Sequence, residues 1–174
     1  MKAAESTMVT LRPVTSADEA FLYALYASTR AEEMALVPWN DQQRELFLRA
    51  QFAAQWCHYQ EYYPTASHDV ILLDEYPVGR LYLERTAEAL NILDVTIAPE
   101  QRGRGLGTPL IRQLLEEATA SERRVTIHIE PFNRARRLFE RLGFAPVETG
   151  EVYWLFVWPT DQGVTQPDNQ ADSA

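Results

Sequence analysis

Apolar residues in the first part of the chain recur with the spacing of one strand followed by two helices. Residues 8–13 alternate apolar and polar side chains, which predicts a first strand. Residues 15–18 offer capping side chains for a helix whose apolar face would carry Phe21, Leu22, Leu25 and Tyr26. Residues 40–62 have the spacing of a longer helix, which Asn40 or Asp41 would cap.

The middle of the chain has the pattern of three successive strands. Short apolar runs cover residues 70–74, 77–84 and 90–98, and the first two are separated by a tight turn. Gly79 lies inside the second run, and an isolated glycine in a strand often marks a bulge. We therefore expect a meander with an irregularity near Gly79.

The last third of the chain alternates helix and strand patterns. Residues 106–121 predict a helix and 123–130 a strand, and Asn133 can cap a further helix through residue 142. Gly143 would end that helix in a left-handed conformation, before two strands at residues 144–147 and 152–158. The resulting fold class is α/β, of the α+β kind: a mixed, mostly antiparallel central sheet of about seven strands with helices on both faces.

Length and composition bound this picture. The 174 residues suit one domain, which we place at 9–159, between a flexible N-terminus (1–8) and a disordered tail (160–174) rich in Asp, Gln, Asn and Pro. No apolar run approaches the roughly 20 residues of a membrane span, and no signal-peptide pattern is present. Cys57 is the single cysteine, so no disulfide forms within the chain and a reducing cytoplasm is expected.

Residues 99–108, with the sequence PEQRGRGLGT, carry the most specific chemical signal. They follow a predicted strand and precede a predicted helix. Glycines at alternate positions let backbone N–H groups converge on one point, and the helix dipole and neighbouring arginines favour an anion there. This loop therefore predicts a site for the diphosphate of a nucleotide-containing cofactor.

Two common diphosphate loops do not fit this segment. The Walker A loop needs Gly-Lys-Ser/Thr, and no lysine lies nearby. The dinucleotide fingerprint needs a third glycine where this chain has Thr108, and it needs an acidic residue on a following strand. What remains is the pattern Arg-x-x-Gly-x-Gly, formed by Arg102, Gly105 and Gly107.

This pattern and its surroundings resemble the GCN5-related N-acetyltransferase (GNAT) superfamily. The preceding strand, NILDVTIAP, resembles the strand that leads into the superfamily's acetyl-CoA loop, and residues 133–144, NRARRLFERLGF, resemble its second hallmark helix. The order of strands and helices agrees over residues 9–158. The resemblance implies a splay between the fourth and fifth strands and direct acetyl transfer to a primary amine of a small molecule, protein or peptide within a ternary complex.

The resemblance also implies which residues bind acetyl-CoA. The fourth strand would pair with the pantetheine arm, the loop's N–H groups would hold the pyrophosphate, and Asn133 would bond to the arm. The cofactor-binding residues would be Val95, Thr96, Ile97, Arg102, Gly103, Arg104, Gly105, Leu106, Gly107, Thr108 and Asn133. Further arginines that could reach phosphates are Arg134, Arg136 and Arg137.

The catalytic groups are less clearly marked. Superfamily members often protonate the CoA thiolate with a tyrosine of the second hallmark helix, where this chain has Phe139. The tyrosines that could take over this role are Tyr82, Tyr153 and Tyr59. Asp94 is an acid inside an apolar strand, so it either faces a cleft or pairs with an arginine. We favour Asp94 as the catalytic residue, with Glu84 and Glu130 as weaker candidates.

Charge and the remaining motifs limit the classes of binding partner that we expect. The net charge is −9, and bases exceed acids only in residues 101–158, around the expected anion site, so nucleic acid is not an expected partner. The three histidines lack metal-ligand spacing, and no metal is expected. Aromatic residues of the second helix belong either to the core or to a pocket for a cationic amine: Trp39, Phe47, Trp56, Tyr59, Tyr62 and Tyr63.

Three interpretations of the function follow from these patterns. The first is an acetyl-CoA-dependent N-acetyltransferase, and the second is a non-catalytic acyl-CoA-binding or sensor domain on the same fold, which Phe139 favours. The third is a structural or interaction domain, in which the glycine loop only turns the chain. The sequence leaves open the acceptor, the acyl chain length and the oligomeric state, a homodimer included.

Overall fold

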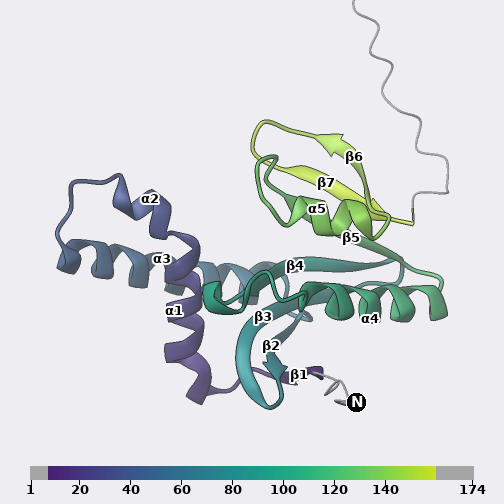
Figure 1. Cartoon of the computed structure of the whole chain (residues 1–174), viewed down its shortest axis with the longest axis horizontal. Coiled ribbons are helices and arrows are strands. Elements are labelled where there is room, and N and C mark those ends of the chain that lie inside the picture. Colours follow the sequence, from purple (N-terminus) through teal and green to yellow (C-terminus); the bar gives the residue numbers. More distant parts are fainter. Residues whose placement is uncertain (1–7, 160–174) are drawn as a thin grey trace, which may run out of the picture.

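A computed structural model of the chain describes residues 8–159; the expectations for 1–7 and 160–174 lie outside the described residues. The described chain forms one seven-stranded sheet in the order β1-β2-β3-β4-β5-β7-β6 (Figure 1). Only the β4–β5 pair is parallel, so the sheet is mixed and mostly antiparallel, as expected. The strands are β1 (Val9–Pro13), β2 (Ser67–Leu73), β3 (Tyr76–Arg85), β4 (Ala89–Ile97), β5 (Arg124–Ile129), β6 (Ala145–Thr149) and β7 (Trp154–Trp158).

Helices cover both faces of this sheet. The helices are α1 (Glu19–Thr29), α2 (Ala31–Ala35), α3 (Asp41–Tyr62), α4 (Gly107–Ala120) and α5 (Arg136–Arg141), with 3₁₀ turns at Ser16–Asp18 and Pro99–Gln101. In Figure 1, α1, α2 and α3 gather at one end of the molecule, whereas α4 runs along the other side of the sheet. The long helix α3 begins with a capping box, in which Asn40 and Gln43 each bond to the other's backbone.

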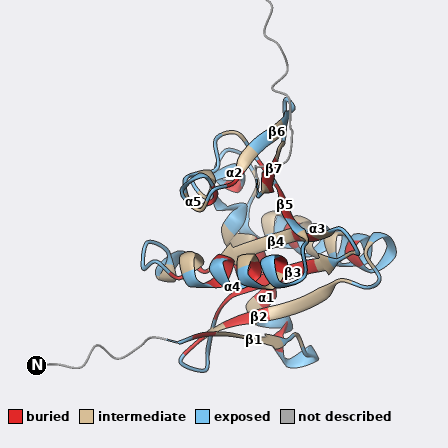
Figure 2. Cartoon of the chain, turned by 90° about the vertical axis from the view of Figure 1, so that its right-hand side faces the viewer, coloured by how far each residue is buried: buried red, intermediate tan, exposed pale blue. Residues whose placement is uncertain are grey.

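The main core lies between the sheet and α4. The apolar stripe of α4, formed by Leu110, Ile111, Leu114 and Ala118, is fully buried against strand residues such as Leu81 and Leu83 (Figure 2). Each large side chain buried this way contributes roughly 1.5–3 kcal/mol. Because side chains alternate along β3, Arg80 and Tyr82 face the opposite side, toward α1 and α3.

The strands β4 and β5 separate halfway along their length. Their parallel pairing runs from Ala89 opposite Arg124 to Ile92 opposite Ile127, and it ends there. Leu93 is an extra residue in β4 at this point, because Tyr82 pairs with Asp94 while Leu83 pairs with Ile92. Such a bulge bends its strand and increases its twist. The expected splay between the fourth and fifth strands is therefore present.

One local expectation is confirmed and another needs correction. The irregularity expected near Gly79 is present, with Val78 as the extra residue, since Ile71 pairs with Gly79 and Leu72 with Pro77. The helix expected from Asn133 begins only at Arg136. The Asn133 side chain still accepts a bond from the N–H of Ala135, as a cap would, but the N–H of Arg136 bonds to the Asn133 carbonyl at 3.1 Å, so residues 133–136 form tight turns ahead of α5.

Candidate active site

The glycine–arginine loop has the backbone geometry of an anion cradle. Gly103 and Gly105 adopt positive φ angles of 75° and 78°, a region that L side chains avoid. A Cβ at either position would meet nothing within 4 Å, so this side of the loop is open. The loop ends at the N-terminus of α4, where N–H groups without helical partners add a partial positive charge.

The other loop residues have different roles from those two glycines. Leu106 is buried in the main core, so only its backbone can contact a ligand. A Cβ at Gly107 would lie 2.7 Å from Leu138, so this glycine lets α4 begin close to α5. The predicted binding loop therefore divides into an open part at 102–105 and a part at 106–107 that anchors it to the core.

The loop arginines hold the shape of the loop itself in this structure. Arg102 donates from Nε to the Ile97 carbonyl at 2.9 Å, and Arg104 donates to the Gln101 side chain. Arg136 pairs with Glu140 at 2.9 Å and lies over the Trp154 ring, whereas Arg134 and Arg137 are exposed. The arginines free to meet a phosphate without breaking an ion pair are therefore those of the loop and the two exposed ones.

The second half of β4 presents an open edge. Val95, Thr96 and Ile97 pair with β3 but lie beyond the end of the β5 pairing. In an antiparallel pair the backbone groups alternate between the partner strand and the opposite edge, so this segment offers N–H and C=O groups to an extended ligand. Gly79 allows β3 to pack closely against this part of β4, since a Cβ at Gly79 would collide with the carbonyl oxygen of Thr96.

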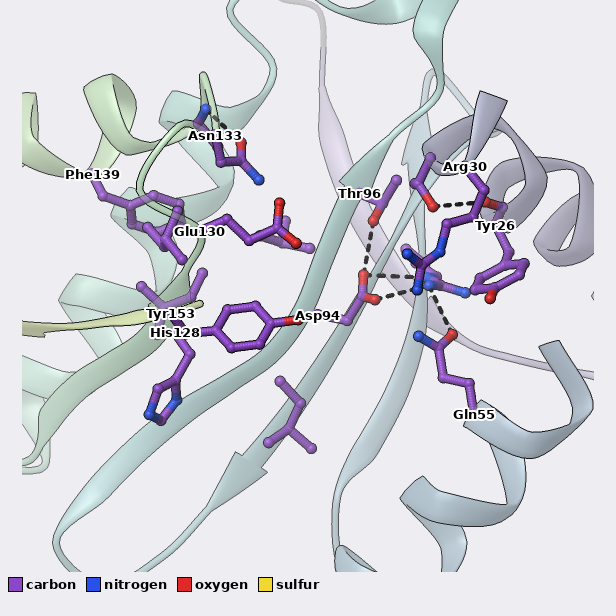
Figure 3. A pocket seen from close by; sticks show the side chains of 17 residues that line it. Tyr26, Arg30, Gln55, Asp94, Thr96, His128, Glu130, Asn133, Phe139 and Tyr153 are labelled. Carbon is purple, nitrogen blue, oxygen red and sulfur yellow. Dashed lines mark hydrogen bonds and ion pairs between the residues drawn. The ribbon is translucent and has the colours of Figure 1, made fainter. Parts of the chain in front are cut away.

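A cleft of about 290 Å³ opens where β4 and β5 separate (Figure 3). One wall comes from β4 and the buried Arg80 behind it, and the other from β5, Asn133 and Phe139. Helices α1 and α3 close one end with Tyr26, Thr29, Arg30 and Gln55. Predicted site residues Asp94, Val95, Thr96 and Asn133 meet here, while Ile97 and the loop continue beyond its rim.

Asp94 is held by a network of charged and polar groups. Its oxygens accept bonds from Arg80 Nε at 3.2 Å, Arg80 Nη2 at 2.8 Å and Thr96 Oγ1 at 2.8 Å. Desolvation disfavours the charge of Arg80, but the Coulomb field and hydrogen bonds of Asp94 outweigh it and raise the arginine's pKa. Asp94 thus both lines the cleft and pairs with an arginine, the two options that the sequence left open.

The structure separates the other candidate catalytic groups by position. Tyr153 lines the cleft, and its ring points across it toward Asp94 (Figure 3). Tyr82 and Tyr59 are buried outside the cleft lining, and burial raises the pKa of both. Glu130 also lines the cleft, where no dashed contact joins it to another labelled side chain. Glu84 instead accepts a bond from Asn91 at 2.9 Å.

Phe139 forms part of the cleft wall rather than a reactive group. Its side chain is 1% exposed and packs edge-to-face on Phe144, with ring centroids 5.1 Å apart. The position therefore belongs to the core that joins α5 to the sheet. A phenylalanine side chain has no proton to donate, and Tyr153 and Tyr26 are the phenols that line the cleft.

Sequence reasoning missed the residues at the α1 and α3 end of the cleft. Arg30, Gln55 and Arg80 were not singled out, although an arginine at an inward position of a buried strand is a usable signal. The aromatic residues proposed for an amine pocket do not line this cleft: Trp39 and Phe47 pack in a second cluster, and Trp56 and Tyr59 pack around His68 and Tyr82. The core alternative holds for Tyr59, which is buried, and for Trp39 and Phe47, which pack against the second cluster. Trp56 is instead 38% exposed and lines a separate pocket.

No group of three or more His, Cys, Asp or Glu side chains within residues 8–159 could hold a metal ion. No helix among these residues is long and apolar enough to cross a membrane.

Comparisons with known proteins agree with this geometry. The model of the acetyltransferase (GNAT) family matches residues 20–144. A PaiA N-acetyltransferase from Thermoplasma acidophilum, solved in complex with coenzyme A, has a TM-score of 0.64 at 12% identity, over 86% of this chain and 98% of that one. An acetyltransferase from Thermus thermophilus has a TM-score of 0.58 at 25% identity, over 86% of this chain and 96% of that one.

A third similar structure is Mycobacterium smegmatis RimJ in complex with CoA-disulfide. Its TM-score is 0.59 at 21% identity, over 86% of this chain and 80% of that chain. At such identities the likeness to the Thermoplasma and Mycobacterium proteins concerns the fold alone.

Proposed function

The chain belongs to the acetyltransferase (GNAT) family, and from this premise we propose that it is an acetyl-CoA-dependent N-acetyltransferase. It would move the acetyl group directly to a primary amine of a small molecule, protein or peptide while both substrates are bound. The observation that carries the proposal is the meeting of an anion cradle, an open strand edge and two carboxylates around one cleft.

Each part of acetyl-CoA has a matching part of the chain in this proposal. The N–H groups of residues 103–108 hold the pyrophosphate at the start of α4, with Arg102 and Arg104 as the neighbouring cations. The pantetheine amides pair with the open edge of Val95 to Ile97 as an added strand. Asn133 offers its amide nitrogen, since its Oδ1 already accepts a bond from Ala135 N–H at 2.9 Å.

The reaction removes two protons from the acceptor nitrogen and returns one to the sulfur. The acceptor ammonium loses the first proton and the free amine attacks the thioester carbonyl; the nitrogen of the tetrahedral intermediate then loses the second proton as the carbon–sulfur bond breaks and the thiolate leaves. Asp94, fixed by Arg80 and Thr96, accepts a hydrogen bond from the ammonium and orients it. Glu130, the residue after β5, lines the same cleft and would take the first proton. The Tyr153 hydroxyl would protonate the sulfur and recover the second proton from the nitrogen.

Calorimetry with acetyl-CoA, followed by a thiol-release assay over a panel of amines and peptides, tests this function. We expect saturable binding of acetyl-CoA and release of CoA that depends on both the acceptor and the enzyme. Absence of acetyl-CoA binding at micromolar concentrations would overturn the proposal.

A non-catalytic acyl-CoA sensor is the second candidate function. The buried Phe139 favours it, because this position supplies no proton to a thiolate. Tight binding of acetyl-CoA with no turnover over the whole acceptor panel would favour the sensor. Turnover that falls when Tyr153 is replaced by phenylalanine would favour the transferase.

A further inference from the structure

The acceptor end of the cleft contains two guanidinium groups from different elements. Arg80 lies on β3 beneath the cleft, and Arg30 lies at the C-terminal end of α1. Figure 3 shows Arg30 pointing from α1 toward the side of the cleft where Asp94 lies. A pocket for a simple cationic amine would gain nothing from two positive groups, because like charges raise the cost of binding a cation.

One donor atom of Arg80 has no use within the described residues. The side chain is 2% exposed; its Nε and Nη2 bond to Asp94, and Nη2 also donates to Gln55 Oε1 at 3.2 Å. Its Nη1 is buried without a hydrogen-bond partner. The guanidinium rests over the Tyr82 ring, 5.1 Å from the centroid, and that face has no oxygen lone pair for Nη1. A buried charged donor without a partner is costly and calls for an acceptor group.

Arg30 can join such an acceptor at little cost. Its partner is Glu33, 3.0 Å away, and both side chains are about half exposed. Exposed ion pairs of this kind contribute between roughly 0 and 1 kcal/mol, so Arg30 can be redirected into the cleft. At this end of the cleft the two arginines face one acid, Asp94, while Glu130 follows the end of β5 on the opposite wall.

We propose that the acceptor amine is an α-amino acid, whose carboxylate binds Arg80 Nη1 and Arg30 while its ammonium binds Asp94. The inference rests on the proposed transferase function and deepens it. The charges of Arg80 and Asp94 are adjacent, with 2.8 Å between Nη2 and Oδ2. A ligand that contacts both must carry its own opposite charges side by side, and in an α-amino acid one carbon separates them. The 290 Å³ cleft also holds the thioester, which favours a small acceptor.

Matched acceptors test the charge requirement directly. A panel of free α-amino acids is compared with the α-carboxamides of the same amino acids, with the decarboxylated amines, and with ω-amino acids whose charges are further apart. We expect kcat/KM for the best free acid to exceed that of its amide by at least about 10-fold, which corresponds to about 1.4 kcal/mol. The amine of the amide is less basic, so a larger fraction of it is present as the free base at neutral pH. A preference for the acid therefore cannot arise from amine basicity.

Two arginine variants provide a matched comparison. Arg30→Gln removes the exposed cleft guanidinium and should reduce the acid-over-amide preference about 5- to 10-fold, mainly through KM. Arg49→Gln is the control, because Arg49 also pairs with a glutamate and lies over a tyrosine ring but does not line the cleft. Arg80→Lys is the more direct change but threatens the fold, so it is interpreted only if its unfolding transition is retained.

A binding measurement keeps the inference separate from turnover. Calorimetry compares N-acetyl α-amino acids with their amides, both on the protein alone and on its CoA complex, and tighter binding of the acids is expected. Equal binding of acids and amides, or acetylation of decarboxylated amines at the rate of the acids, would overturn the inference while leaving the transferase function intact. Failure of acetyl-CoA to bind would instead overturn the proposed function. The binding of N-acetyl amino acids and of their amides would still be compared on the protein without CoA.

Discussion

The glycine–arginine loop and the Arg80–Asp94 cleft are two halves of one proposed site, built in opposite ways. The loop is a single exposed segment, in which two glycines at positive φ leave open space for an anion. The cleft is assembled from α1, α3, β3, β4, β5, α5 and the segment before β7, and its central ion pair is buried, with Arg80 only 2% exposed. The loop would act through backbone groups, and the cleft would act through side chains.

Because of this difference, the loop is suited to binding the cofactor and the cleft to selecting the acceptor. Backbone N–H groups are the same in every residue, so a loop of this kind suits the part of a substrate that never changes. Side chains from many separate elements can change independently, so the cleft suits the part of the reaction that distinguishes one acceptor from another. Perturbing each half should therefore produce different losses: stability and specificity in the cleft, cofactor affinity in the loop.

The largest effect is expected from Arg80→Leu. This change leaves the Asp94 carboxylate, with 14% of its side chain exposed, without its charged partner. Removing one member of a buried pair typically costs about 3–5 kcal/mol of unfolding free energy. Urea denaturation measures the loss. The double variant Arg80→Leu/Asp94→Leu should recover much of it, and Arg85→Gln at an exposed pair should cost under about 1 kcal/mol. A loss as small in Arg80→Leu would contradict the buried-pair argument.

Gly105→Val is expected to reduce acetyl-CoA affinity by about 100-fold or more, or about 2.7 kcal/mol. The backbone at Gly105 has a φ of 78°, which a branched side chain disfavours, and the new side chain would occupy the open face of the loop. Calorimetry gives the affinity. Gly143→Val is the matched control, because Gly143 also has a positive φ, of 94°, but packs by Trp158. If both variants lost acetyl-CoA affinity to the same extent, the loss would come from general destabilisation and not from the loop.

The contrast also explains how much of the molecule the sequence could predict. The loop was identified from its local sequence, because its proposed function depends on local φ preferences and on the helix that follows it. The mixed sheet of about seven strands came from the hydrophobic pattern and the splay from the family resemblance, and the structure confirms both. The cleft's Arg30, Gln55 and Arg80 were missed, because they meet only after segments 25 to 50 residues apart fold together. Asn133 illustrates a local limit, since a helix cap and a side-chain turn use the same residue type.

Tyr153→Phe tests the proton donor of the cleft and should lower kcat about 10-fold. General acid catalysis often contributes more, but a thiol has a pKa near ~8.5, so its thiolate leaves with modest need of a proton. The measurement is the pH profile of kcat, in which the loss should shrink as pH rises. Tyr76→Phe, in an exposed position at the β2–β3 turn, is the control. An unchanged profile in Tyr153→Phe would remove this residue from the mechanism.

The smallest effect concerns the pH dependence of the packing behind the cleft. His68 stacks on Tyr82, with ring centroids 4.4 Å apart, and lies edge-on to Trp56. Burial lowers the pKa of His68; Asp69 opposes this shift, and the charge of Arg80 adds to it. The folded protein therefore holds the neutral ring, while the unfolded chain takes up a proton near its usual pKa of about 6.5.

The sign of the pH effect follows from that difference in proton uptake. The contribution of His68 to stability is fully present above about pH 6.5 and is lost as pH falls toward the lower pKa of the folded state. Because the ring is only partly buried, we expect less than about 1 kcal/mol between about pH 7.5 and pH 5.5, measured by urea denaturation. His68→Phe should flatten this part of the profile, whereas His58→Gln on the exposed surface of α3 should leave it unchanged. A steeper loss in His68→Phe than in the native chain would mean that other groups control the acid sensitivity of the cleft.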